Sequence, residues 1–230
     1  MSVSNRIRGL SSMATRQVLA DMAAAWRHSG GDVAFESVGG VEAAKRVQDG
    51  EKFDIVVLAA DAIDKLVAAG RIVAGSKTDL ARSAVAIAVR AGAPRPAIDT
   101  EAALREAVLS ARTIGYSTGP SGVALQQLFA RWGIAEAIRS RVVQAPPGIP
   151  VGTLITRGDV ELGFQQLSEL MHVEGIDVIG PMPPGLAIVT TFSGGICTAS
   201  TQADAARALL DFIRSPAADE AKRRHGMQAA

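Results

Sequence analysis

The chain has 230 residues, of which 48% are hydrophobic and only 4% aromatic. That length exceeds the usual size of one domain, so two lobes with cores of Ala, Val, Leu and Ile are expected. The 24 basic and 23 acidic residues give a net charge of +1, and no basic run stands out, which argues against nucleic acid and membrane surfaces as partners.

Short apolar runs alternate with helical patterns along the chain, which is typical of an α/β fold. The elements predicted in the first part are strands over 6–10, 32–38 and 53–59, each followed by a helix, over 13–30, 41–50 and 61–70. A further apolar strand is predicted over 83–90, and the helix after its proline-containing loop has Asp99 or Thr100 as its cap.

The middle of the chain, "TIGYSTGPSGVALQQLFARWGI", predicts a buried strand over 113–116, a loop of small polar residues and an amphipathic helix. The N–H groups at a helix start lack partners, and the helix dipole places partial positive charge there, so this loop is suited to hold an anion. The later elements are a strand from 141, a helix over 151–158, strands over 160–164, 176–183 and 186–196, and a helix over 202–216.

Several chemistries find no support in the sequence. Neither a GxGxxG nor a GxxxxGK[ST] loop is present, and no cofactor is implied. His28, His172 and His225 have no second ligand at metal spacing, so no metal site is expected. Cys197 reads as a small buried hydrophobe. No run is long enough to cross a membrane, and the first dozen residues do not resemble a secretory signal, which predicts either a cytoplasmic protein or a chain starting near a processed terminus.

Small polar residues gather where the predicted strands end. Ligands of open α/β sheets bind at the carboxyl ends of strands. Taken in order, the segments there resemble the type II periplasmic solute-binding family, in its molybdate-binding branch: "GLSSMATRQVLADMAAAW", "FDIVVLAAD", "GPSGVALQQLFARWGI", "GDVELGFQQLSEL" and "ALLDFIRSPAADEAKRRHGM". The resemblance covers nearly the whole chain.

This resemblance implies a two-lobed α/β fold with two crossings between the lobes. Lobe 1 would comprise residues 1–82 and 187–230, lobe 2 would comprise 83–186, and a ligand would lie between them and be enclosed by a hinge motion. Carried over by position, the ligand contacts fall on Ser11 or Ser12, Gly39, Ala60, Ser121 with Gly122, Pro150 or Val151, and Gln166.

The chain departs from the family pattern at three of these positions. Gly39 stands where the family has a hydroxyl, and Gln166 where it has a tyrosine. Pro150 has no N–H, which leaves Val151 and Gly152 as donors there. Arg82 adds a cation where a neutral residue is typical, either to bind a carboxylate or to pair with Asp79 or another acid at the surface. Gln165 is either structural or a further amide donor.

Two functions follow from the resemblance. The first is a binding protein of the ABC-transporter type, periplasmic and served by a permease, which traps a small anion and more readily an organic carboxylate than molybdate. The second is an enzyme, because the same branch includes aconitate isomerases, which shift a double bond in a tricarboxylate. Glu36, Glu169 and His172 are the candidate bases for that chemistry, and the missing signal peptide favours it.

Overall fold

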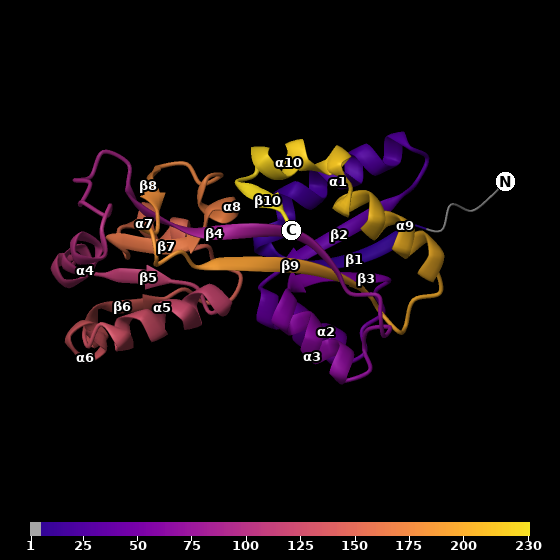
Figure 1. The fold of residues 1–230 in the computed structure, drawn as a ribbon, viewed down its shortest axis with the longest axis horizontal. Coiled ribbons are helices and arrows are strands. Elements are labelled where there is room, and N and C mark those ends of the chain that lie inside the picture. The colour runs from indigo at the N-terminus through magenta and orange to yellow at the C-terminus, as the bar shows by residue number, and fades with distance from the viewer. Residues whose placement is uncertain (1–5) are drawn as a thin grey trace. The chain divides into compact units, whose positions relative to one another are not determined.

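The computed structural model of the chain describes residues 6–230, which form two compact α/β units (Figure 1). Unit 1 comprises the residues up to Ser83 together with Thr191–Ala230, and unit 2 comprises Ala84–Thr190. The chain passes from unit 1 to unit 2 along β4 (Thr78–Arg90) and returns along β9 (Val189–Ile196).

Unit 1 is built on three parallel strands in the order β2-β1-β3, with β9 antiparallel to β3. The strands are β1 (Ile7–Ser12), β2 (Val33–Val38) and β3 (Ile55–Ala59), and a short β10 (Met227–Ala229) pairs with β4. One face packs against α1 (Arg16–His28), α9 (Ala203–Arg214) and α10 (Asp219–Arg224), and the other against α2 (Gly40–Gln48) and α3 (Ala60–Ala68). The 3₁₀ turns of this unit are η1 (Met13–Thr15) and η3 (Pro216–Ala218).

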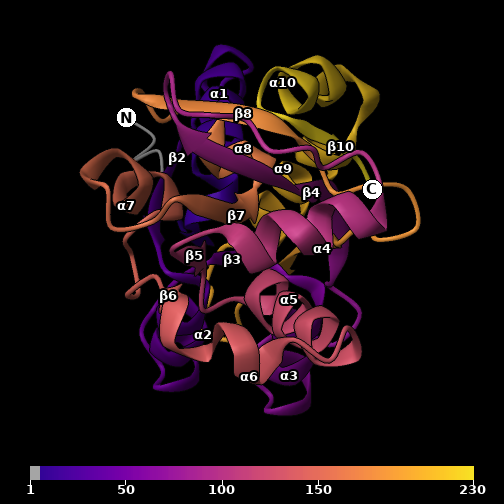
Figure 2. The same ribbon diagram turned by 90° about the vertical axis from the view of Figure 1, so that its left-hand side faces the viewer.

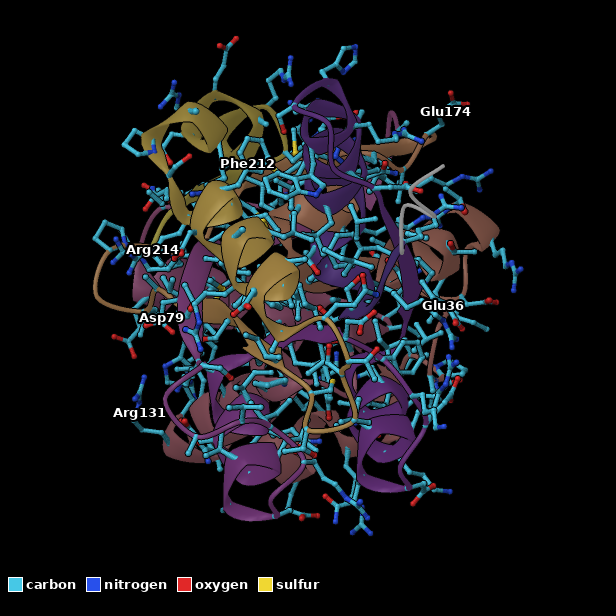
Figure 3. All side chains as sticks on the ribbon, turned by 90° about the vertical axis from the view of Figure 1, so that its right-hand side faces the viewer. Glu36, Asp79, Arg131, Glu174, Phe212 and Arg214 are labelled. Carbon is cyan, nitrogen blue, oxygen red and sulfur yellow. The ribbon has the colours of Figure 1, made fainter. Side chains whose placement is uncertain are left out.

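Strand β3 shows why two helical layers form in unit 1. Its five residues are all apolar and buried. Because successive side chains of a strand point to opposite faces, Ile55 and Val57 enter the core under α1 and α9, while Val56 and Leu58 enter the core under α2 and α3. On the first face Trp26 packs against Phe212, which Figure 3 labels, with 5.3 Å between the ring centroids.

Unit 2 repeats this plan with parallel strands in the order β7-β5-β6, where β4 lies antiparallel to β7 and β8 pairs with β4. The strands are β5 (Ile114–Tyr116), β6 (Val142–Gln144), β7 (Leu162–Gln166) and β8 (Ile176–Pro181). The helices α4 (Glu101–Ser110), α5 (Pro120–Arg131) and α6 (Ala135–Ile138) pack in one core, and α7 (Val151–Arg157) and α8 (Leu167–Leu170) in the other (Figure 2); η2 (Arg139–Arg141) leads into β6.

The predicted α/β class is confirmed, and so is the Thr100 cap, whose Oγ1 accepts from the N–H of Ala103 at 3.1 Å. Most elements begin or end a few residues from their predicted limits, and three differences bear on the site. β4 begins at Thr78 instead of residue 83, β1 includes both Ser11 and Ser12, and β10 was not predicted. Each of these segments is polar or short and becomes a strand through pairing with a neighbour that lies far away in sequence. Among the described residues, none of the helices combines the length and apolar character that crossing a bilayer requires.

Candidate functional site

The carboxyl ends of β1, β2 and β3 meet at one edge of the unit 1 sheet, because the three strands are parallel. Each strand runs directly into a helix start: Ser12 precedes η1 and α1, Gly39 caps α2, and Ala60 is the first residue of α3. Neither α2 nor α3 has a side-chain cap. Their first N–H groups therefore lack a side-chain acceptor, and this edge carries partial positive charge.

Ser12 is the polar side chain of this edge that lacks a partner. Its hydroxyl is buried and makes no hydrogen bond with any residue of the described chain, whereas its carbonyl accepts from Thr15 Oγ1 at 3.1 Å. A β-carbon placed on Gly40 would come within 3.6 Å of the Ser12 Cβ, so the start of α2 lies against this side chain. The hydroxyl is available to a ligand at the edge that the sequence predicts.

Ser11, the other predicted serine, is already engaged. Its hydroxyl lies 2.8 Å from that of Ser37 on β2, and Ser11 is completely buried. As the last two residues of a strand, Ser11 and Ser12 point to opposite faces of the sheet. Of the two serines that the resemblance offers for this contact, Ser12 is therefore the one whose hydroxyl is unpaired, because β1 extends through both and turns them to opposite faces.

Arg82 does not meet the expectation of a buried guanidinium. It is exposed on β4, and its Nε and Nη2 donate to the carbonyl oxygen of Ala229 at 3.1 and 3.0 Å, where β4 pairs with β10. The alternative partner Asp79 instead accepts from the Ser193 hydroxyl at 2.6 Å. Arg82 thus fastens the C-terminal strand to unit 1, and we leave it out of the set of ligand donors.

Unit 2 presents a second edge of the same kind, where β5, β6 and β7 end and are followed by α5, α7 and α8. Ser121 and Gly122 lie in the first turn of α5 and are buried. The Ser121 hydroxyl lies 3.3 Å from that of Ser117. A β-carbon on Gly122 would come within 1.8 Å of the Ser117 carbonyl oxygen, so only glycine permits the loop to fold this closely over the helix start.

Val151 and Gln165 are paired with each other. The N–H of Val151 donates to Gln165 Oε1 at 2.7 Å, and both residues are buried. Gln165 also hydrogen-bonds the carboxyl of Glu169. The Val151 amide is therefore not free to donate to a ligand, because Gln165 accepts from it. The Gln165 side chain is engaged by Val151 and Glu169, which agrees with the structural alternative for this residue.

Gln166 keeps one end of its amide unpaired. Its Nε2 donates to Thr190 Oγ1 at 2.7 Å, but its Oε1 is buried and has no hydrogen-bond partner within residues 6–230. Gln166 is 4% exposed and Thr190 9% exposed. A buried amide with a free end is costly unless a ligand satisfies it. Sequence analysis did not identify Thr190, because a threonine inside an apolar strand carries no distinctive signal.

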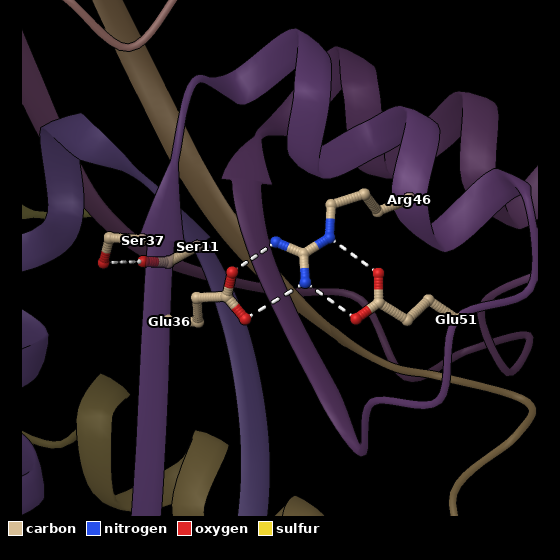
Figure 4. A network of polar contacts seen from close by, with 5 residues as sticks. All are labelled: Ser11, Glu36, Ser37, Arg46 and Glu51. Atoms are coloured by element: carbon tan, nitrogen blue, oxygen red, sulfur yellow. Dashed lines mark hydrogen bonds and ion pairs between the residues drawn. The ribbon is translucent and has the colours of Figure 1, made fainter.

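The three candidate bases lie in different environments. Glu36 is held by Arg46, whose guanidinium also pairs with Glu51 (Figure 4), and hydrogen bonding to Arg46 lowers the pKa of Glu36. His172 is exposed after α8. Glu169 lies half-buried in α8, and burial raises the pKa of its carboxyl to about 7, while the hydrogen bond with Gln165 opposes that rise. Glu169 is thus poised to exchange a proton near neutral pH.

Comparison with known proteins gives relatives over most of the chain. Residues 7–228 match the family described as bacterial extracellular solute-binding protein. An aconitate isomerase of a Pseudomonas species is 38% identical over 184 residues, which is 80% of this chain and 70% of that protein. A molybdate-binding protein of Azotobacter vinelandii is 27% identical over 186 residues, 79% of this chain and 73% of that protein. The solved periplasmic molybdate-binding protein of the same organism superposes with a TM-score of 0.79 at 18% identity, over 96% of this chain and 98% of that one.

Proposed function

Since the chain belongs to the bacterial extracellular solute-binding protein family, we propose that it binds a small organic anion through carboxylate groups. The observation that carries this proposal is the Ser12 hydroxyl, which is buried, unpaired and adjacent to helix starts that lack side-chain caps. Uncapped N–H groups and a hydroxyl donor together favour negative charge. The donors we assign to unit 1 are the Ser12 hydroxyl, the amide of Gly39 just before α2, and the amide of Ala60 at the first residue of α3.

In unit 2 we assign Ser121, Gly122 and Gln166 to the same ligand, as the family resemblance implies. The Thr190 hydroxyl can either donate or accept, so the Gln166 amide can turn end for end and keep that bond. In the turned orientation the amide N–H₂ is free to donate to a carboxylate. That a single ligand contacts donors of both units remains a prediction.

A carboxylate fits these donors better than molybdate does. Gly39 supplies no hydroxyl, and Gln166 supplies an amide where the molybdate-binding branch has a tyrosine hydroxyl. The greater identity to the aconitate isomerase than to the molybdate-binding protein, 38% against 27%, points in the same direction.

Calorimetric titration with citrate, trans-aconitate, molybdate and sulfate tests the proposal. We expect binding of a tricarboxylate, and we expect Ser12→Ala and Gln166→Leu each to weaken it about tenfold or more, as loss of a hydrogen bond to a charged group does. Ser140→Ala and Gln127→Leu, at exposed positions of unit 2, are matched controls. The proposed ligand class would be refuted if Ser12→Ala and Gln166→Leu bound the tricarboxylate as tightly as the unaltered chain, or if molybdate were the only ligand bound.

A second candidate function is isomerisation of a bound tricarboxylate, and Glu169 is the observation that favours it. A carboxyl with a pKa near 7 can remove a proton from the carbon next to a double bond and return one to the far carbon, which shifts the double bond without a net change in composition. Proton NMR of trans-aconitate with the protein would show conversion to the cis isomer. We expect Glu169→Gln to abolish turnover and retain binding; conversion at the unaltered rate would exclude Glu169 as the base.

Under the binding function, we propose a periplasmic location and an ABC permease as partner. The two lobes would be residues 1–82 with 187–230 and residues 83–186, as the resemblance implies. Uptake assays of labelled citrate in cells of the source organism with and without the gene test this role. Uptake that does not depend on the protein would contradict it.

A further inference from the structure

A groove of about 520 Å³ runs along unit 1 between α1 and β2. One side is formed by the α1 residues Arg16, Ala20, Ala23 and Arg27, and the other includes Phe35 and Ser37 of β2. These α1 positions are spaced so that they share one face of the helix. The groove therefore has a small apolar floor with an arginine toward each end.

β2 is the edge strand of the unit 1 sheet, since it pairs only with β1 among the described strands. The N–H of Ile7 donates to the carbonyl of Asp32 at 3.0 Å, and the backbone groups of a parallel strand alternate in direction from residue to residue. Hence Ala34 and Glu36 bond toward β1, whereas Val33, Phe35 and Ser37 turn their N–H and C=O groups outward. The residues with outward backbone groups also line the groove.

The charged residues that line the groove are all arginines. Arg6 pairs with Asp32 at 3.4 Å, but the guanidinium groups of Arg16 and Arg27 have no hydrogen bond or ion pair with any residue of the described chain, and both residues are exposed. Eleven residues separate these two arginines on α1, which corresponds to about 16 Å along a helix. About five residues of an extended strand cover the same distance.

The single acid on the edge strand is directed away from this groove. Glu36 lies between Phe35 and Ser37 in β2, so its side chain points to the opposite face of the sheet from theirs. There the Arg46 guanidinium binds its carboxylate (Figure 4). A charged residue on an edge strand ordinarily discourages pairing with another chain. Here that charge is neutralised on the far face, and the groove side stays cationic.

From these features we infer that the groove binds an extended acidic segment of a partner protein, which adds to the unit 1 sheet as a strand beside β2. The alternating outward N–H and C=O groups of β2 match those of an extended peptide backbone. Acidic side chains of the segment would reach Arg16 and Arg27, and apolar ones would lie on Ala20, Ala23 and Phe35. This interaction is separate from the proposed small-anion site and does not depend on it.

The test uses the full chain and a fluorescein-labelled peptide with blocked termini and the sequence Ser-Glu-Ser-Val-Ser-Val-Ser-Glu, in which the glutamates and valines occupy every second position and so share the face that would lie on the groove. Fluorescence anisotropy at low salt should show saturable binding that weakens with rising ionic strength. Arg16→Ala and Arg27→Ala should each reduce affinity about threefold, and the double reversal Arg16→Glu with Arg27→Glu should abolish binding. The matched control Arg105→Glu with Arg131→Glu, at exposed positions of unit 2, should bind like the unaltered chain.

Two further arms separate strand addition from charge attraction alone. A peptide methylated on alternate backbone nitrogens should bind at least tenfold more weakly, because it cannot pair with the edge of β2. Ser12→Ala should leave peptide affinity unchanged even where it weakens binding of citrate. Equal binding of the methylated peptide, equal loss in the unit 2 control, or no saturable binding would each overturn the inference.

Discussion

The backbone N–H of Val151 donates to Oε1 of Gln165 at 2.7 Å, so the first residue of α7 is bonded to the penultimate residue of β7 inside unit 2. Gln165 in turn bonds Glu169, the half-buried carboxyl of α8. One side chain thus connects a helix start, a strand and a titrating acid. Stability and proton uptake of unit 2 should therefore respond to the same residue.

Replacing Gln165 tests the first of these connections. Gln165→Leu leaves the buried N–H of Val151 without an acceptor, so we expect the free energy of unfolding to fall by about 2 kcal/mol. Urea denaturation measures this change. Gln127→Leu, at an exposed position of α5, is the control and should be near neutral; a similar loss in both variants would argue against the pairing.

Glu169 should make stability depend on pH in a defined direction. Burial raises its pKa from 4.5 to about 7, so the folded state binds more protons than the unfolded state between these values. The free energy of unfolding should then decrease as pH rises from about 5 to 8, by at most about 3 kcal/mol from this group. In Glu169→Gln that decrease should disappear. Parallel urea titrations of both proteins at pH 5 and pH 8 would detect it, and an unaltered slope in the variant would assign the dependence to other groups.

The two serines of β1 should behave in opposite ways. Ser11→Ala removes the hydroxyl contact with Ser37 and should lower the free energy of unfolding by about 1 kcal/mol. Ser12→Ala removes an unpaired buried hydroxyl, so stability should stay the same or rise slightly, while affinity for the anionic ligand falls. Thermal unfolding without ligand and calorimetry with ligand separate these effects. A stability loss in Ser12→Ala would indicate a partner that the folded chain itself supplies.

Arg46 should stabilise unit 1 mainly above pH 4. Hydrogen bonds to Arg46 lower the pKa of both Glu36 and Glu51, and the guanidinium also lies 5.3 Å from the centroid of the Phe53 ring. A lowered carboxyl pKa contributes stability that is present above its unfolded value and is lost as pH falls through the folded one. Arg46→Met should therefore lower the melting temperature at pH 7 and show a smaller deficit at pH 3.

The control for this experiment is Arg112→Met. Arg112 pairs with Glu161 at 3.0 Å, but its side chain is 88% exposed, and an exposed pair contributes little. Its melting temperature should stay close to that of the unaltered chain at both pH values. Equal deficits of the two variants at pH 7, or a deficit of Arg46→Met at pH 3 as large as the one at pH 7, would contradict the role given to Arg46.

Patterns of apolar residues predicted most elements correctly, because those patterns reflect local rules, and the order of five motifs predicted the family. The five apolar residues Ile55–Ala59 predict a strand buried on both faces, and the structure confirms it. The polar start of β4 and the three residues of β10 were missed, since no local pattern marks them. β10 becomes a strand only because residues 227–229 pair with residues 81–83, and β4 also has β9 as a neighbour in the sheet.

The sequence by itself determined the α/β class, the solute-binding family and the strand ends that carry small polar residues, because periodicity and motif order are properties of the chain. Only the tertiary structure decided which polar groups are already satisfied. Ser11 is engaged and Ser12 is not, Arg82 binds the carbonyl of Ala229, and Gln165 is occupied while one end of the Gln166 amide is free. The reason is physical: a hydrogen bond needs a partner in space, and these partners lie on other strands and helices whose positions no local stretch of sequence specifies.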